Sequence, residues 1–309
     1  MILLKERRVS IMRKKISSSK SEQISSYILL IPTLILLGVM VLYPLIQTAI
    51  FSLYRIDLLK FSERTFVGLK NYVELFKDSE FIRSLTTSII FTIVVVPIQC
   101  ILAFLIAILL ENTFKFRGLF RTIFFVPYIT STVATAIIFM KLFTQDGLLS
   151  KFFSFFGLPN TTWYTNLDLA LPFLAFIYIW TTLGFYIVLF STGLNTIPEE
   201  LYDAAKIDGA NNVQTIRFIT IPVLKPFIFL ILSTAIISAF QVFDQAYVLA
   251  RGASLGSPAG ATMTLPVFVY AQAFRYNRVD HGAAAAMILL LLVLTITMVL
   301  RGRFSDDSV

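Results

Sequence analysis

Few side chains in this sequence of 309 residues are of the types that make or break covalent bonds. His281 is the only histidine and Cys100 the only cysteine. These counts exclude an internal disulfide and argue against a histidine- or cysteine-based metal site and against a Ser-His-Asp triad. The glycines do not form a G-x-x-x-x-G-K-[ST] phosphate-binding loop. The residue types therefore favour recognition over catalysis, and no enzyme is predicted.

Two groups of residues are suited to recognition. One is an acidic, alanine-rich segment, EELYDAAKIDGANN (199–212), which stands between two long apolar runs. The other consists of polar, aromatic and small residues inside those runs, where polar groups are costly in lipid and usually face a cavity or another helix. They are Trp180, Thr181, Gly184 and Tyr186 in the first run, and Ser238, Gln241, Asp244 and Gln245 in the second.

Each member of the second group also has a plain structural interpretation. Thr181 and Thr182 could bond only to their own helix backbone, and Gly184 could only permit close helix packing. Asp244 could pair with Arg251 at the outer interface. Gln99 and the cluster Thr130, Ser131 and Thr132 are weaker candidates of the same kind.

The composition identifies the solvent of this chain. Apolar residues make up 57% and charged residues 14% of the sequence, and the mean hydropathy is +0.81. A water-soluble globule needs more polar surface than that. Six apolar stretches, each long enough for a helix to cross about 30 Å of hydrocarbon, lie near 27–51, 84–110, 122–143, 169–194, 224–250 and 282–300. The sequence therefore predicts an all-α membrane protein with six transmembrane helices.

The charge distribution indicates how these helices are oriented. Seven of the lysines and arginines fall in residues 1–26, directly before the first stretch. This is the pattern of a cytoplasmic anchor rather than a nucleic-acid-binding face, despite the net charge of +8. The first stretch is too long for a cleaved signal peptide. We expect a cytoplasmic tail at 1–26, starting at Met1 or Met12, a membrane domain at 27–302 and a cytoplasmic end at 303–309.

Three outer loops are expected at 55–83, 144–168 and 251–281. The first contains the amphipathic segment FVGLKNYVELFKDSEF (66–81), which could either lie along the membrane surface or cap the spans. The third begins with RGASLGSPAG (251–260), whose glycines, serines and proline predict an irregular loop.

The segment between the fourth and fifth stretches has the signals of a folded element. Thr196 with Glu199 fits a capping box and Pro198 suits a first turn, so a helix is predicted there, with Leu201, Ala204 and Ala205 on one face. Gly209 is placed to end it, and Asn211 with Gln214 can start a second helix. Pro222 and Pro226 then mark the turn into the fifth stretch. By pattern alone, the element could be a docking site or a connecting loop.

At this point the sequence resembles a known family. Asp203-Ala204-Ala205, then Gly209, then Ile219-Thr220-Ile221-Pro222 resemble the EAA signature, E-A-A-x₃-G-x₉-I-x-L-P, of permease subunits in binding-protein-dependent ABC importers. The spacing is intact, with aspartate in place of the usual glutamate and Ile221 in place of leucine. The segments at 66–81, 117–129, 197–210 and 239–249 are similar to the carbohydrate branch, including the larger permease of the maltose importer.

The resemblance implies a type I ABC importer permease fold in the bacterial cytoplasmic membrane. It implies that the loop 196–222 couples to a cytoplasmic ATPase dimer, which alone uses ATP and Mg, so that this chain binds no cofactor or metal. A second permease subunit, forming a heterodimer, and an extracytoplasmic sugar-binding protein are the other implied partners; nucleic acid is not one. The implied coupling residues are Glu200, Asp203, Ala204, Ala205, Gly209, Ile219 and Pro222.

The resemblance to the carbohydrate branch implies a sugar as cargo. Planar polar groups and aromatic rings bind sugars, so Trp180, Tyr186 and Gln241 are consistent with such a cargo, and the substrate contacts of the maltose importer lie in corresponding parts of these spans. The sequence does not identify which sugar is carried. Glycerol-3-phosphate or a polyol are alternatives within the same importer class. An ion-coupled secondary transporter is a further alternative, for which Asp244 is the one plausible intramembrane acid.

Overall fold

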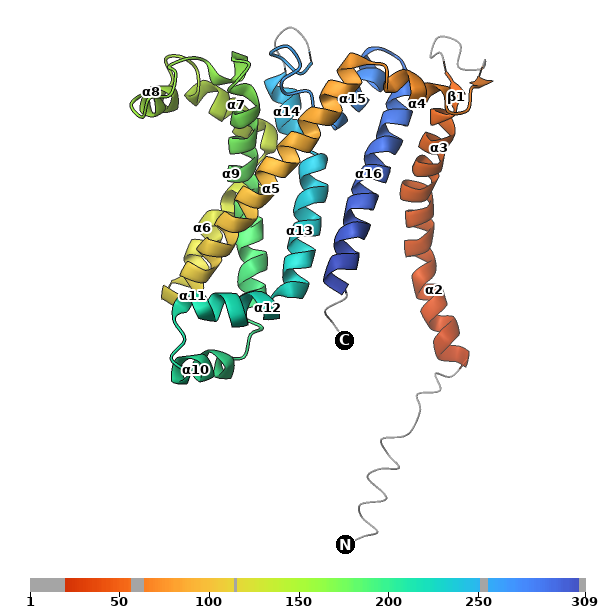
Figure 1. Cartoon of the computed structure of the whole chain (residues 1–309). Helices are drawn as coiled ribbons and strands as arrows, with labels where there is room; N and C mark the ends of the chain where they lie inside the picture. Colours follow the sequence, from red (N-terminus) through yellow and green to blue (C-terminus); the bar gives the residue numbers. More distant parts are fainter. Residues whose placement is uncertain (1–19, 57–63, 114–115, 251–254, 306–309) are drawn as a thin grey trace. The chain divides into compact units, whose positions relative to one another are not determined.

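The computed structural model describes residues 20–56, 64–113, 116–250 and 255–305 (Figure 1). Most of the expected basic tail, Arg251 and the last four residues lie outside these ranges. The chain divides into two compact units, residues 1–50 and 51–309, and each is described by itself.

The first unit is a single apolar helical segment. It runs through α2 (Lys20–Leu37), a π-helical stretch η1 (Gly38–Leu42) and α3 (Tyr43–Ser52) without leaving helical geometry. Residues 29–52 are long and apolar enough to cross a membrane. Almost all of its large apolar side chains are exposed, as expected for a helix whose solvent is lipid.

Four long helices form the core of the second unit. They are α5 (Ser79–Thr113), α9 (Ala170–Leu194), α13 (Lys225–Phe240) and α16 (Val279–Ser305). The 35 residues of α5 give a length of about 50 Å, so this helix must tilt to fit a bilayer, and Figure 1 shows it running obliquely across the others. Large side chains such as Phe91, Phe173 and Ile231 fill the interior, while Ala235 and Ala284 let helices approach closely.

The third predicted span is not the straight helix expected over 122–143. It consists of α6 (Arg117–Ile129) and α7 (Thr132–Leu142), whose axes differ by 93°. Pro127 lies in the last turn of α6, and the Ser131 hydroxyl caps α7 by accepting a bond from the Ala134 N–H at 3.4 Å. A proline followed by a capping serine explains the break.

The fifth predicted span is also interrupted. Helix α13 ends at Phe240, residues 241–243 are not helical, and α14 (Asp244–Leu249) follows. In the described residues there are five helices long and apolar enough to span a membrane, or six if the bent pair α6 and α7 is one span.

Short elements gather at the two ends of the second unit (Figure 1). At one end lie α10 (Glu199–Ile207), α11 (Asn212–Thr215), the π-helical η4 (Ile216–Thr220) and α12 (Ile221–Val223). The other end contains the short helices α4 (Lys70–Leu75), α8 (Leu148–Ser154), α14 and α15 (Leu265–Tyr270), and the π-helical η5 (Ala271–Arg275). It also contains a 3-10 turn, η3 (Trp163–Thr165), and a two-stranded antiparallel ribbon formed by β1 (Tyr54–Arg55) and β2 (Thr65–Phe66).

The amphipathic segment 66–81 caps the spans rather than lying free. Its helix α4 packs against the start of α16 and buries Asn71 and Leu75 completely. The Asn71 amide donates hydrogen bonds to the carbonyl oxygens of Ser52, at 2.9 Å, and Tyr54, at 3.0 Å.

Candidate functional site

The turn that ends α10 has the geometry expected from its glycine. Gly209 has φ +76°, in the left-handed region that glycine adopts without a side-chain penalty. Its N–H bonds to the Lys206 carbonyl at 3.1 Å, and the next N–H, of Ala210, bonds to the Ala205 carbonyl at 2.9 Å. These two bonds form a Schellman motif. The predicted turn is therefore confirmed.

The capping box predicted for the start of α10 is wrong. The helix begins at Glu199, but no side chain caps it, and the Thr196 hydroxyl instead donates to the Gly193 carbonyl at 2.7 Å. Pro198 is extended, with ψ 135°, so Thr196 belongs to the end of the preceding helix rather than to this one. Two acidic residues in the first turn, Glu199 and Glu200, favour this end of the helix electrostatically instead.

The second helix of this loop starts as predicted. The Asn211 side chain accepts from the Gln214 N–H at 2.9 Å, and the Gln214 side chain accepts from the Asn211 N–H at 2.8 Å. The hydroxyls of Tyr202 and Thr220 lie 3.3 Å apart and join α10 to η4. Both helices of the loop are thus fixed by bonds within it.

One face of α10 is exposed. Leu201 and Ala204 lie on it together with Ile207, which is 87% exposed. Ala205 is buried, so the prediction that it shares a face with Leu201 and Ala204 is wrong. We call Leu201, Ala204 and Ile207 the docking face. Ile207 was missed in the sequence, although its position three residues after Ala204 was a signal.

The remaining expected coupling residues are mostly exposed. Glu200, Asp203, Gly209 and Pro222 are exposed and Ile219 is half-buried. The Asp203 carboxylate already has a partner within the helix, the Lys206 ammonium at 2.9 Å.

Two of the residues expected along the substrate pathway have helix-packing roles. The Thr181 hydroxyl donates to the carbonyls of Ile177 and Tyr178 in its own helix, at 3.0 and 2.9 Å. A Cβ atom at Gly184 would stand 1.9 Å from the backbone oxygen of Phe124 in α6. These contacts match the structural interpretations given above for both residues.

A second set of expected pathway residues is exposed. Trp180 is 41% exposed, Gln241 and Asp244 are also exposed, and Ser238 is half-buried. The Asp244 carboxylate accepts a hydrogen bond from the Thr132 hydroxyl at 3.0 Å, which joins the start of α14 to the start of α7, beside the break in the third span. The alternative pairing of Asp244 with Arg251 lies outside the described residues.

A buried polar cluster lies between α5, α9 and α13. The Gln99 carbonyl accepts from the Thr182 hydroxyl at 2.7 Å, while its amide nitrogen is buried with no hydrogen-bond partner. The Tyr186 side chain, also buried, lies next to Gln99 and Ser238. Gln245 is buried as well. The sequence indicated Gln99 only as a weak candidate.

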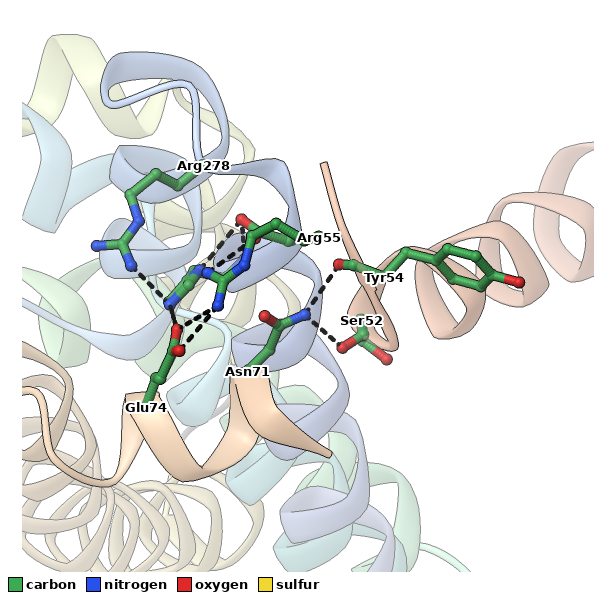
Figure 2. Close-up of polar contacts among 8 residues, drawn as sticks. Ser52, Tyr54, Arg55, Asn71, Glu74 and Arg278 are labelled. Carbon is green, nitrogen blue, oxygen red and sulfur yellow. Dashed lines mark hydrogen bonds and ion pairs between the residues drawn. The ribbon is translucent and has the colours of Figure 1, made fainter. Parts of the chain in front are cut away.

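An ionic network that the sequence did not predict lies at the opposite end from α10. Figure 2 shows Arg55, Glu74 and Arg278 converging on one point. Arg55 donates two bonds of 2.8 Å to the Glu74 carboxylate and lies 3.4 Å from the Asp280 carboxylate. His281, which is fully buried, lies 3.1 Å from each of these carboxylates, and the Arg278 guanidinium lies 2.6 Å from its Nε2.

This network joins β1, α4 and α16 through ion pairs and hydrogen bonds. The hydrogen bonds from Arg55 lower the pKa of the Glu74 carboxyl below its ordinary value, against a smaller opposing effect of burial. The described part of the chain contains no group of three or more His, Cys, Asp and Glu side chains arranged to hold a metal ion. The network joins residues 55, 74 and 280, so no local spacing in the sequence could have indicated it.

Comparisons with known proteins agree with this architecture. The family described as "Binding-protein-dependent transport system inner membrane component" matches residues 72–308. The chain is 33% identical over 258 residues to the lactose transport system permease protein LacF of Rhizobium radiobacter, covering 82% of this chain and 84% of that protein. It is 32% identical over 296 residues to the arabinooligosaccharides transport system permease protein AraP of Bacillus subtilis, covering 93% and 91%.

A third relative and a solved structure extend the comparison. The trehalose/maltose transport system permease protein MalF of Thermococcus litoralis is 33% identical over 286 residues, with 91% of this chain and 94% of that protein covered. The fold matches a chain of a bacterial ABC transporter involved in the import of the acidic polysaccharide alginate, with a TM-score of 0.79, 20% identity, and coverage of 94% and 98%. The chain belongs to the family of inner membrane components of binding-protein-dependent transport systems, and it is a membrane-spanning permease of the ABC importer type.

Proposed function

We propose that this chain is the permease subunit of an ATP-driven sugar importer, that it forms half of the translocation pathway, and that it is coupled to a separate cytoplasmic ATPase through the loop 196–222. The observation that carries the proposal is α10, an exposed helix that ends in the Schellman turn at Gly209 and lies at the end of the unit opposite the outer loops. Relatives named for lactose, arabinooligosaccharide and trehalose/maltose transport support a sugar as cargo.

The hydrogen bonds within the loop suit it to transmit a partner's motion. A frayed segment would absorb a partner's motion, whereas the Schellman turn at Gly209 and the capping box at Asn211 hold both helices in fixed geometry. The docking face is small and apolar, with Glu200 and Asp203 beside it, so a partner's surface can approach closely while charges fix its orientation. We place this end in the cytoplasm, together with both termini, because of the basic residues in 1–26.

The proposed pathway surface consists of Trp180, Gln241 and Asp244, with Thr132 as an addition. An exposed carboxylate in a spanning segment would be costly against lipid, so this face is expected to meet water or the second permease subunit. Thr181 and Gly184 keep packing roles, and Tyr186, Ser238 and Gln245 support the surface from behind it. An indole ring and a planar amide are the groups expected to stack on and bond to a sugar.

The test is transport by the reconstituted complex. Vesicles containing this chain, its partner permease and the ATPase, supplied with the binding protein, should accumulate labelled sugar only with hydrolysable ATP; a non-hydrolysable ATP analogue is the control. Uptake by this chain alone, driven by a proton or sodium gradient, would overturn the proposal. A thermal-shift screen of the cognate binding protein against sugars, polyols and glycerol-3-phosphate would identify the cargo. Stabilisation by a polyol or by glycerol-3-phosphate, but by no sugar, would favour that compound as the cargo instead.

A further inference from the structure

The outer loop between α7 and α9 carries an exposed aromatic patch. Phe152, Phe155 and Phe156 are 55%, 88% and 66% exposed, and their rings contact one another edge to face. We call these three residues the aromatic patch. Leu148, on the same helix α8, is also exposed. Three phenylalanines and a leucine gathered on one surface are more than the scattered apolar residues of an ordinary water-facing loop.

The patch is held rigidly. Phe153, between the exposed rings in sequence, points inward and stacks on Phe143 with ring centroids 5.8 Å apart, and Trp163 packs on Phe143 at 4.7 Å. The backbone N–H of Trp163 donates to the Phe143 carbonyl at 3.1 Å, and the Ser150 hydroxyl donates to the Thr161 carbonyl at 3.3 Å. Helix α8 is therefore a fixed platform next to the end of α7.

The position of the platform indicates what it meets. Helix α8 begins six residues after α7 ends, at the end of the unit opposite α10 (Figure 1). A span ends where hydrocarbon gives way to lipid headgroups, and aromatic side chains collect at that level in membrane proteins. Ile137 and Ile138 of α7 also have exposed apolar side chains.

The charge beside the patch also fits a lipid. Lys151 is exposed on α8, 3.8 Å from the exposed carboxylate of Asp146. A cation beside exposed phenylalanines is the combination by which interfacial helices meet phosphate headgroups and acyl chains together. Residues 155–158 continue as Phe, Phe, Gly and Leu, so the apolar surface extends past the end of α8.

We propose that the aromatic patch inserts into the outer leaflet at the boundary between headgroups and acyl chains, and that it anchors the depth of α7. Helix α7 is one half of a span broken by 93°, so it lacks the straight 20-residue run that normally fixes a helix across the bilayer. An interfacial anchor next to its end supplies that constraint. This inference does not depend on the identity of the cargo.

Spin labelling in the reconstituted importer tests the proposal. Cys100 is the only cysteine, so Phe155→Cys or Phe156→Cys in a Cys100→Ala background carries a single label. Oxygen, which concentrates in lipid, should relax these labels several-fold more than a water-soluble nickel chelate does. The matched control, Asp146→Cys, should show the reverse. Preferential relaxation by the chelate at residue 155, or shielding from both reagents by a protein partner, would overturn the proposal.

A second measurement does not require removal of the buried Cys100. Phe155→Trp in the otherwise unchanged chain adds one fluorophore to the two native tryptophans. Lipids brominated near the headgroup end of the acyl chain should quench the added fluorescence more than lipids brominated near the chain terminus, with the unsubstituted chain as the baseline. Absence of additional quenching by either lipid would contradict insertion.

Discussion

Replacement of Gly209 by valine separates the backbone geometry of the coupling loop from its contacts. A Cβ atom at Gly209 would meet nothing within 4 Å, so no clash is introduced. The residue nevertheless has φ +76°, and a left-handed conformation costs an L-residue about 1–2 kcal/mol, with β-branched residues at the unfavourable end. The substitution therefore acts on the turn alone.

The size of the effect follows from the length of the helix. Helix α10 has nine residues, fewer than the roughly 12–15 at which an isolated helix becomes even marginally stable. Its order depends on its terminal turn and on the packing of Ala205 and Tyr202. A cost of about 1–2 kcal/mol lowers the equilibrium constant of the native turn by a factor of about 5–30. We expect a several-fold fall in sugar taken up per ATP hydrolysed.

The assay compares Gly209→Val with Gly209→Asn in vesicles that contain the complete importer. Asparagine adopts left-handed geometry more readily than other residues with a side chain, so this variant should keep most of the coupling although it is polar and larger than glycine. Insertion into the membrane should be equal for both. Normal uptake per ATP by the valine variant, or equal losses in the two variants, would refute the argument that the turn transmits the motion.

Three other predictions follow from the second unit. Gly184→Ala should destabilise the protein by about 1–3 kcal/mol and lower its melting temperature in detergent, because the added Cβ would clash with the α6 backbone. The control is Gly118→Ala, which should leave the melting temperature unchanged because a Cβ there meets nothing within 4 Å. The pair with Arg55 lowers the pKa of Glu74, so the stability that it contributes is fully present above the ordinary pKa of 4.5 and is lost as the pH falls through the lowered pKa. Glu74→Gln should remove that part of the pH dependence of the melting temperature. Asp244→Asn should reduce uptake several-fold with little change in melting temperature; unchanged uptake would remove this residue from the pathway.

The helices themselves were readable from the sequence because lipid imposes a simple rule. A run of about 20 apolar residues satisfies its backbone only as a helix, and helices are found at each of the six expected ranges. The break at residues 130–131 was not predicted, although Pro127 and Ser131 were visible signals. Residues 130–132 at the break are polar, but the apolar residues on both sides of them together have the length of one span.

The sequence does not show in the same way which face of each helix packs against the rest of the protein. In water, an apolar stripe marks the side that packs, but in lipid both sides are apolar, and helix α9 shows no such stripe. Trp180 and Thr181 are neighbours in sequence, yet one is exposed and the other is 2% exposed. Which side chains of α9 face the interior therefore follows only from the packing of α9 against α5 and α6.

The two ends of the second unit differ in how their order is encoded. The turns of the loop 196–222 are specified by bonds between residues at most five apart, such as those of Gly209 and Asn211, so that these turns could be predicted from a single sequence. Only the Tyr202–Thr220 contact that joins α10 to η4 spans more positions, 18 of them. The outer network joins Arg55 to Asp280 across 225 positions, so it requires elements that are distant in sequence to lie side by side. Locally encoded order means that the shape of the loop does not depend on contacts with distant parts of the chain, as the coupling role proposed for it requires. At the outer end, the ionic network depends on contacts between residues distant in sequence and on the packing of α4 against α16. Substitutions in this network should therefore change the stability of the protein first and its coupling to the ATPase only secondarily.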